Sequence, residues 1–177
     1  GWVDLQTPDD TPQTFSIGAN IPISWTKKGT IGNLKIEYSA KGDFTDAVTI
    51  DPGFPSGADD PTVNSLTPVW TAPFKVSETY KIRVSNITPP AGTEASDTST
   101  ANFGVRPAIN TISPPSAASI WNAGASQTIT WTATSATKID GITLPTVKIE
   151  YNVDGGIYNT ITGAAALNCA NVTNNFI

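Results

Sequence analysis

The chain presents one order of motifs twice, roughly a hundred residues apart. The segment Ile21–Trp25 (IPISW) returns as Gln127–Trp131 (QTITW), and Leu34–Ser39 (LKIEYS) returns as Val147–Asn152 (VKIEYN). A spacing of this size matches a whole domain and is too long for the repeat of a solenoid. The chain is therefore predicted to contain two copies of one domain.

Apolar and polar residues alternate with a period of two in several short segments. This alternation is typical of antiparallel strands that have one buried and one solvated face. Clusters of Pro and Gly between the segments predict tight turns. About seven such strands in a hundred residues predict an all-β fold of tandem immunoglobulin-like antiparallel β-sandwiches. The alternating segments are Val3–Leu5, Ile21–Trp25, Leu34–Tyr38, Val48–Ile50, Val69–Thr71, Tyr80–Val84, Ala101–Val105, Gln127–Thr132, Thr146–Asn152 and Tyr158–Ile161.

The second copy is predicted to be incomplete. The boundary between the copies falls at Arg106-Pro107, so the first sandwich spans residues 1–106 and the second spans residues 107–177. When the second copy is aligned to the first, counterparts of Thr79–Ser85 and Ser99–Val105 are missing. The last strands of the second sandwich are therefore absent from this sequence.

An incomplete sandwich would leave apolar residues and a strand edge uncovered, and both invite pairing with another chain. Two explanations stay open. The sequence begins with Gly1 and has no Met, so it can be a processed or excerpted piece of a longer one. Alternatively, a strand of another subunit completes the fold, with Trp2–Thr7 as the candidate donor. The residues expected to lack cover are Ile112, Trp131, Val147, Ile149, Tyr151 and Ile161.

The order of these motifs resembles the immunoglobulin-like repeat of Ser/Thr-rich cell-surface proteins, which occurs in GPI-anchored fungal wall proteins and in large repetitive bacterial surface proteins. The resemblance covers most of the chain and implies an extracellular β-sandwich. It brings no catalytic residues with it. The matching residues are Phe15, Gly18, Ile23, Trp25, Leu34–Tyr38, Trp70, Pro73, Tyr80–Val84 and Phe103, then Pro114, Trp121, Gly124, Ile129, Trp131 and Val147–Tyr151.

Composition excludes several classes of function. The net charge of −5 argues against nucleic acid as a partner. The chain has no His, which is the commonest general base and metal ligand, and no spacing singles out another catalytic set. No apolar run approaches the ~20 residues of a membrane-spanning helix. We therefore expect neither an enzyme nor a membrane-spanning protein.

The alternation assigns core and surface positions. Trp25 and Trp131 occupy the same place in the repeat and are predicted to lie in equivalent core positions. Lys35 and Glu37 alternate with apolar neighbours and are predicted to face solvent. On a neighbouring strand, Lys81 or Arg83 would then lie across from Glu37 in an exposed ion pair.

Other candidate sites are weaker. Asp59 and Asp60 are the best candidates for a calcium site in a loop, although solvated acidic turns are the favoured explanation of these residues, and no other cofactor is expected. Asn86 and Asn171 each begin an Asn-x-Thr glycosylation pattern, which chance also explains in an Asn- and Thr-rich chain. Cys169 is the one cysteine, so it forms no disulfide within the chain and is predicted to be a partly buried thiol.

These observations predict an extracellular structural or adhesive module, with a surface filament or layer as one form of its assembly. Its expected partners are other copies of itself or neighbouring domains of a longer chain. A carbohydrate-binding module that docks to a polysaccharide is the first alternative. An accessory domain of a larger secreted enzyme is the second.

Overall fold

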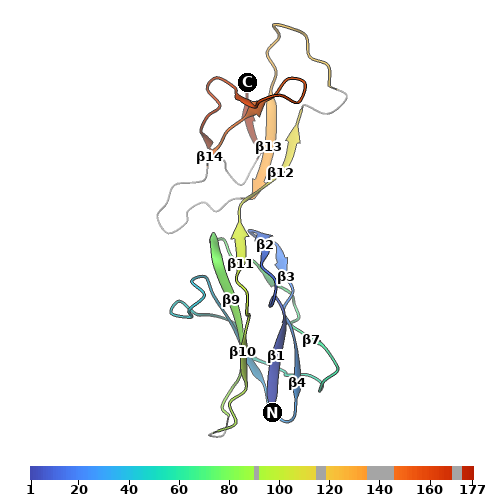
Figure 1. The fold of residues 1–177 in the computed structure, drawn as a ribbon, viewed down its shortest axis with the longest axis vertical. Helices are drawn as coiled ribbons and strands as arrows, with labels where there is room; N and C mark the ends of the chain where they lie inside the picture. Colours follow the sequence, from blue (N-terminus) through green and yellow to red (C-terminus); the bar gives the residue numbers. More distant parts are fainter. Residues whose placement is uncertain (90–91, 115–118, 135–145, 169–172) are drawn as a thin grey trace. The chain divides into compact units, whose positions relative to one another are not determined.

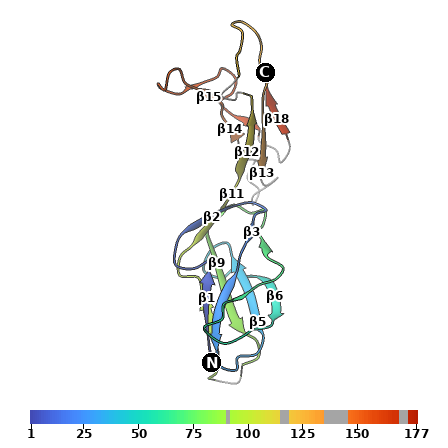
Figure 2. The same ribbon diagram turned by 90° about the vertical axis from the view of Figure 1, so that its right-hand side faces the viewer.

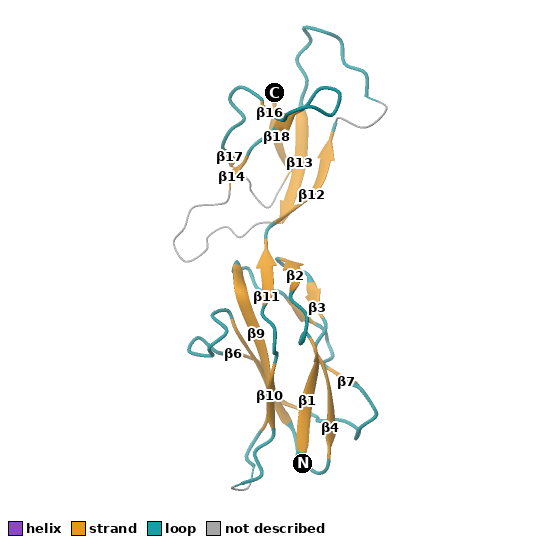
Figure 3. Ribbon diagram, in the orientation of Figure 1, coloured by secondary structure: helices purple, strands orange, loops and turns teal. Residues whose placement is uncertain are grey.

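The protein is all-β in the part that the computed structural model describes, which is residues 1–89, 92–114, 119–134, 146–168 and 173–177 (Figure 3). No helix occurs among these residues, and hence none long and apolar enough to cross a membrane. The chain divides into two compact units, Gly1–Arg106 (unit 1) and Pro107–Ile177 (unit 2).

Two larger sheets form unit 1, an arrangement consistent with a β-sandwich (Figures 1 and 2). The first sheet has the order β1-β4-β7, with β1 at Trp2–Thr7, β4 at Ser24–Lys28 and β7 at Asn64–Ser65. The second has the order β2-β11-β9-β5-β6, with β10 also paired to β9. All pairs are antiparallel except β2 with β11. The strands of the second sheet are β2 (Gln13–Ser16), β5 (Leu34–Ser39), β6 (Val48–Phe54), β9 (Ser77–Asn86), β10 (Ser96–Thr98) and β11 (Phe103–Arg106), and β3 (Asn20–Ile21) pairs separately with β8 (Trp70–Thr71).

Trp25 is central to the core of unit 1. Its side chain is fully buried and meets the ring of Phe54 edge-on, with the ring centroids 5.8 Å apart. The indole N–H donates a hydrogen bond of 2.9 Å to the carbonyl oxygen of Ser56, so burial leaves no unsatisfied donor. The predicted core position of Trp25 is confirmed.

A cluster of aromatic rings joins the strands of the second sheet. Tyr38 on β5 packs against Tyr80 on β9, with centroids 5.8 Å apart, and Tyr80 stacks on Phe103 of β11 at 5.4 Å. Phe15 of β2 meets Phe103 edge-on. Trp70 packs against Tyr38 at 5.0 Å. Strands β9 and β11 thus supply the rings that cover the aromatic residues of β5 and β2.

Unit 2 repeats the first sheet of unit 1. Its order is β12-β13-β18, with all pairs antiparallel, where β12 is Ala108–Ser113, β13 is Ile129–Thr134 and β18 is Thr173–Phe176. Trp131 pairs with Ile112 and Asn174, just as Trp25 pairs with Leu5 and Asn64. Trp131 is 4% exposed, which confirms that the two tryptophans hold equivalent buried positions.

A turn before each of these tryptophan strands also repeats. Gly18 has φ of +73° and Gly124 has φ of +79°, a region that glycine enters without the steric penalty of a Cβ atom. The two glycines occupy the same place in the repeat. Both positions therefore favour glycine for the same reason, which is their positive φ.

A broken hairpin in unit 2 corresponds to β5 and β6. Val147 pairs with Leu167, as Leu34 pairs with Phe54, and Glu150 pairs with Thr160. Its strands are β14 (Thr146–Val147), β15 (Glu150–Tyr151), β16 (Asn159–Thr160) and β17 (Leu167–Asn168). Within the described residues of unit 2, no strand takes the places that β9, β10 and β11 hold in unit 1.

The predicted donor role of Trp2–Thr7 is wrong. This segment is β1 and pairs with β4 along its length, from Trp2 with Lys28 to Thr7 with Ser24. Val3 and Leu5 are buried inside unit 1. Removal of the segment would expose that core, so the strand is committed to its own unit.

Replacement of Trp25 by Ala is expected to lower the free energy of unfolding of unit 1 by about 4 kcal/mol, because a large cavity replaces the buried indole. Urea unfolding followed by circular dichroism measures the change, with a separate transition allowed for each unit. Trp2→Ala is the matched control, since Trp2 is 42% exposed. Equal losses for the two variants would contradict the core position of Trp25.

Candidate functional site

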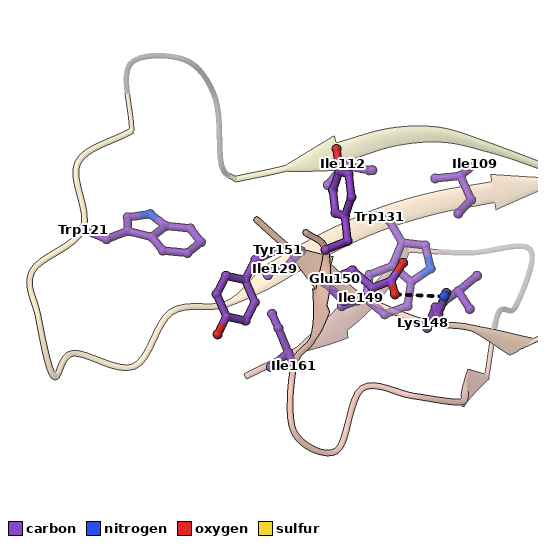
Figure 4. A pocket seen from close by; sticks show the side chains of 12 residues that line it. Ile109, Ile112, Trp121, Ile129, Trp131, Lys148, Ile149, Glu150, Tyr151 and Ile161 are labelled. Carbon is purple, nitrogen blue, oxygen red and sulfur yellow. Dashed lines mark ion pairs between the residues drawn. The ribbon is translucent and has the colours of Figure 1, made fainter. Parts of the chain in front are cut away.

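An apolar groove of about 560 Å³ lies in unit 2, between β12 and β13 on one side and the 146–161 stretch on the other (Figure 4). Isoleucine and aromatic side chains form most of its wall, and one ion pair lies at its edge. Its lining residues are Ile109, Ile112, Trp121, Ile129, Trp131, Val147, Lys148, Ile149, Glu150, Tyr151, Tyr158 and Ile161. All six residues that were expected to lack cover are among them, but only Ile112 and Tyr151 are exposed, whereas Trp131 is buried and the other three are half-buried.

Trp131 anchors the packed side of the groove. With Ala133 it forms a small core against which Val147, Ile149, Leu167 and Phe176 pack. Unlike Trp25, Trp131 has an indole N–H for which the described residues provide no hydrogen-bond acceptor. A buried donor without a partner costs about 1–3 kcal/mol, so this core is less well satisfied than that of unit 1.

The β12 wall of the groove is exposed where its counterpart is buried. Ile109 and Ile112 are 50% and 60% exposed, whereas Val3 and Leu5, at the equivalent places of β1, are 6% and 1% exposed. In unit 1, β1 packs against β9 and β10 as well as pairing with β4. The described part of unit 2 has no counterpart of those two strands, which accounts for the exposure of Ile109 and Ile112.

The aromatic residues of the groove show the same contrast. Tyr151 is 51% exposed, while Tyr38, its counterpart, is half-buried against Tyr80 and Trp70. Trp121 is 42% exposed and takes the place in the repeat of Phe15, which packs against Phe103 in unit 1. These two exposed rings, of Tyr151 and Trp121, correspond to rings that β9 or β11 covers in unit 1.

The edge of the groove carries one ion pair, between Lys148 Nζ and Glu150 Oε1 at 2.8 Å (Figure 4). Thr160 also donates a hydrogen bond of 3.4 Å to the same carboxylate oxygen. The equivalent carboxylate in unit 1, that of Glu37, binds two cations, Lys35 and Arg83. Among the described residues, Glu150 has a counterpart of the first cation and none of the second.

A pairing of Glu37 with Lys81 or Arg83 was predicted, and Arg83 is the partner, but the burial of Glu37 was not predicted. Glu37 and Arg83 face each other across β5 and β9, and the guanidinium donates through Nε and Nη2 to Oε2 at 3.2 and 2.8 Å. Glu37 is only 5% exposed, so the prediction of a solvent-facing carboxylate is wrong. The ring of Phe44 lies against the guanidinium of Arg83, with 4.3 Å between the guanidinium carbon and the ring centroid. The paired cations and this loop residue cover the carboxylate, and strand alternation does not reveal such cover.

Burial alone would raise the pKa of Glu37, but hydrogen bonds from Lys35 and Arg83 outweigh that effect and lower the pKa below its usual 4.5. A carboxyl group with a lowered pKa in the folded state stabilises the fold above its unfolded pKa. That stabilisation is lost as the pH falls through the folded value.

The acidic residues proposed for calcium lie in unit 1, away from the aromatic cluster. Asp59 forms an ion pair of 2.7 Å with Lys27 and accepts a hydrogen bond of 3.3 Å from the Gly29 N–H. The hydrogen bond from Lys27 lowers the pKa of Asp59, and the Gly29 N–H adds to the effect. Asp60 is exposed. In the described part of the chain, no group of three or more acidic, His or Cys side chains is placed to hold a metal ion, and the calcium site stays a prediction.

Asn86 ends β9 and holds the following loop. Its side-chain amide donates to the Thr93 carbonyl oxygen at 3.2 Å and accepts from the Ala95 N–H at 2.9 Å. Glycosylation of Asn86 would break these contacts unless the remaining amide hydrogen kept its bond to the Thr93 carbonyl oxygen. Asn171 and Cys169 lie outside the described residues.

The comparisons add no relative to this description. No protein-family model, no curated protein and no solved structure matches the chain. The geometry of the groove and the equivalent, covered face of unit 1 are therefore the basis for a proposed function.

Sequence reasoning missed part of the groove. The lining residues that were not predicted are Ile109, Trp121, Ile129, Tyr158 and the Lys148–Glu150 pair. The repeat itself held the signal for Trp121, which stands where Phe15 stands in unit 1. A residue-by-residue comparison of the two units would have shown that Lys148 and Glu150 repeat Lys35 and Glu37. It would also have shown that no predicted strand of the second unit supplies a counterpart of Arg83.

Replacement of Glu37 by Gln is expected to lower the free energy of unfolding by about 2 kcal/mol at pH 7, because two charge-assisted interactions are lost. The difference between wild type and variant should shrink as the pH falls below 4.5, where the unfolded wild-type carboxyl takes up its proton. Urea unfolding at pH 7, 5 and 3 tests both statements. Glu78→Gln is the matched control, because Glu78 pairs with Arg106 on the exposed surface. A constant difference from pH 7 to pH 3 would contradict the role of the charge.

Proposed function

We propose that the chain is a non-catalytic structural module of an extracellular protein, built from two immunoglobulin-like units, and that it associates with other polypeptides through the groove of unit 2. The proposal brings together the strand repeat, the Ser/Thr-rich cell-surface resemblance and the exposed groove. The groove is the observation that carries it. Contiguous apolar surface that water reaches is the usual mark of a protein interaction site.

The polarity of the groove favours polypeptide over sugar. Carbohydrate sites combine aromatic rings with several polar groups that orient the hydroxyls of the ligand. Trp121, Tyr151 and Tyr158 supply rings, and their exposure is the reason to retain a carbohydrate-binding module as the second candidate. Among the described residues that line the groove, Lys148 and Glu150 are the only charged ones, and they bind each other. The rest of the wall is mainly aliphatic, which suits the side chains of a strand.

The proposed association is tested by placing a charge in the groove. Wild-type chain is expected to bind an apolar fluorescent dye and to self-associate weakly at high concentration, as seen by sedimentation velocity, because apolar surface is exposed. Ile112→Lys should reduce both effects. Val63→Lys is the matched control, since Val63 is a 56% exposed apolar residue of unit 1.

Two results would overturn the proposal. The first is a wild-type chain that neither binds the dye nor associates with itself or with an added polypeptide. The second is an equal effect of the two lysine substitutions. Binding of a soluble polysaccharide that Ile112→Lys abolishes, without polypeptide binding, would favour the carbohydrate module instead.

A further inference from the structure

The uncovered edge in unit 2 has a counterpart in unit 1 that is occupied. There, β5 pairs with β6 on one side and with β9 on the other, in continuous register from Leu34 with Asn86 to Ser39 with Lys81. In unit 2, the stretch from Thr146 to Tyr151 pairs on the β6-like side alone, as far as the structure describes the chain. Backbone N–H and C=O groups on the other side are the groups that an added strand would use.

We propose that this edge and the groove beside it bind an extended strand of another polypeptide with the residue pattern of β9. The pattern is aromatic, basic, aliphatic, basic, aliphatic, as in Tyr80–Val84. The inference rests on the proposed function and specifies the chemistry of the partner at the same site. The strand would run antiparallel to residues 147–151, with its second basic residue opposite Glu150, as Arg83 lies opposite Glu37.

Apolar complementarity supports the pattern. The side chains of Tyr80, Ile82 and Val84 are fully buried in unit 1. They lie on the strand next to β5, and Tyr80 contacts Tyr38. In unit 2 the counterpart of Tyr38, Tyr151, is 51% exposed at the groove. An aromatic–aliphatic–aliphatic face would cover such residues and remove their apolar surface from water.

Charge complementarity fixes the register. Lys148 and Glu150 repeat Lys35 and Glu37, and Glu150 carries no counterpart of the Arg83 contact among the described residues. An Arg or Lys at the second basic position would restore the two-cation arrangement. A slip by one residue would point that cation to the opposite face of the strand, so the carboxylate discriminates between registers.

A strand from a separate polypeptide fits better than a second copy of this chain. In unit 1, β9 is hydrogen-bonded to neighbours on both sides, and β1 pairs with β4, so a second copy would have to unfold to donate either strand. Two grooves packed face to face would cover apolar side chains. They would still leave the strand-edge N–H and C=O groups unpaired.

A synthetic peptide with the sequence of residues 77–86 (SETYKIRVSN) provides the probe. The labelled peptide is titrated with the full chain and followed by fluorescence anisotropy. We expect saturable binding, and we expect the peptide to suppress any self-association of the chain. The peptide with Arg83→Glu should bind at least about tenfold more weakly, because a charge-assisted contact becomes a repulsion.

A charge exchange identifies the residue that the peptide contacts. Chain variant Glu150→Arg should bind the wild-type peptide more weakly and recover affinity for the Arg83→Glu peptide. Glu150→Gln removes the charge with little change of shape and should weaken only the wild-type peptide. Glu94→Arg is the matched control in unit 1, where Glu94 is exposed, and it should leave both affinities unchanged.

The outcomes separate the inference from the proposed function. Absence of peptide binding, or equal binding of the two peptides, overturns the inference even if the chain still self-associates through the groove. A stable dimer that excludes the peptide overturns it in favour of a second copy as the occupant. If the wild-type chain shows no dye binding, no self-association and no peptide binding, the proposed function is overturned as well.

Discussion

An apolar sheet face needs a second layer, and most features of both units follow from how far that need is met. In unit 1, Trp25 lies buried beneath a second sheet whose strands β9 and β11 supply Tyr80 and Phe103. The same first sheet recurs in unit 2 around Trp131. There the second layer consists of the 146–168 hairpin, within the described residues. Trp131 and Ala133 are still buried, but Ile109, Ile112 and Tyr151, which line the same groove, are exposed.

The alternation of residue types was enough to predict the strands, the repeat and the two tryptophans. A period of two determines which face of a strand each side chain occupies, so Trp25 and Trp131 follow from pattern alone. The absence of counterparts of Tyr80–Val84 also predicted an incompletely covered face, of which Ile112 and Tyr151 are exposed residues. These predictions depend on local order along the chain, which the sequence displays directly.

Predictions failed where they depended on contacts with residues distant in the sequence. Glu37 lies on the polar side of its strand as expected, but Arg83 and Lys35 bind its carboxylate and it is buried. Trp2–Thr7 looked like an unattached apolar segment, yet β4 pairs with it. Long-range pairing and the packing of loops are set by contacts distant in sequence, which periodicity does not report. The sequence was enough to anticipate an incompletely covered face in unit 2. It was not enough to predict which side chains line the groove.

The missing layer also affects the energetics of unit 2. Burial of Leu5, Tyr80 and their neighbours in unit 1 is the kind of apolar transfer that contributes most to folding, whereas Ile109, Ile112 and Tyr151 stay in contact with water. Trp131 adds a buried N–H without an acceptor among the described residues. The described part of unit 2 therefore gains less from apolar burial than unit 1 does, and an occupant of the groove would add to that burial. A ligand that binds only the folded state adds RT ln(1 + [L]/Kd) to its stability. Binding at the groove and folding of unit 2 are thus coupled equilibria. A bound partner strand would raise the free energy of unfolding of unit 2.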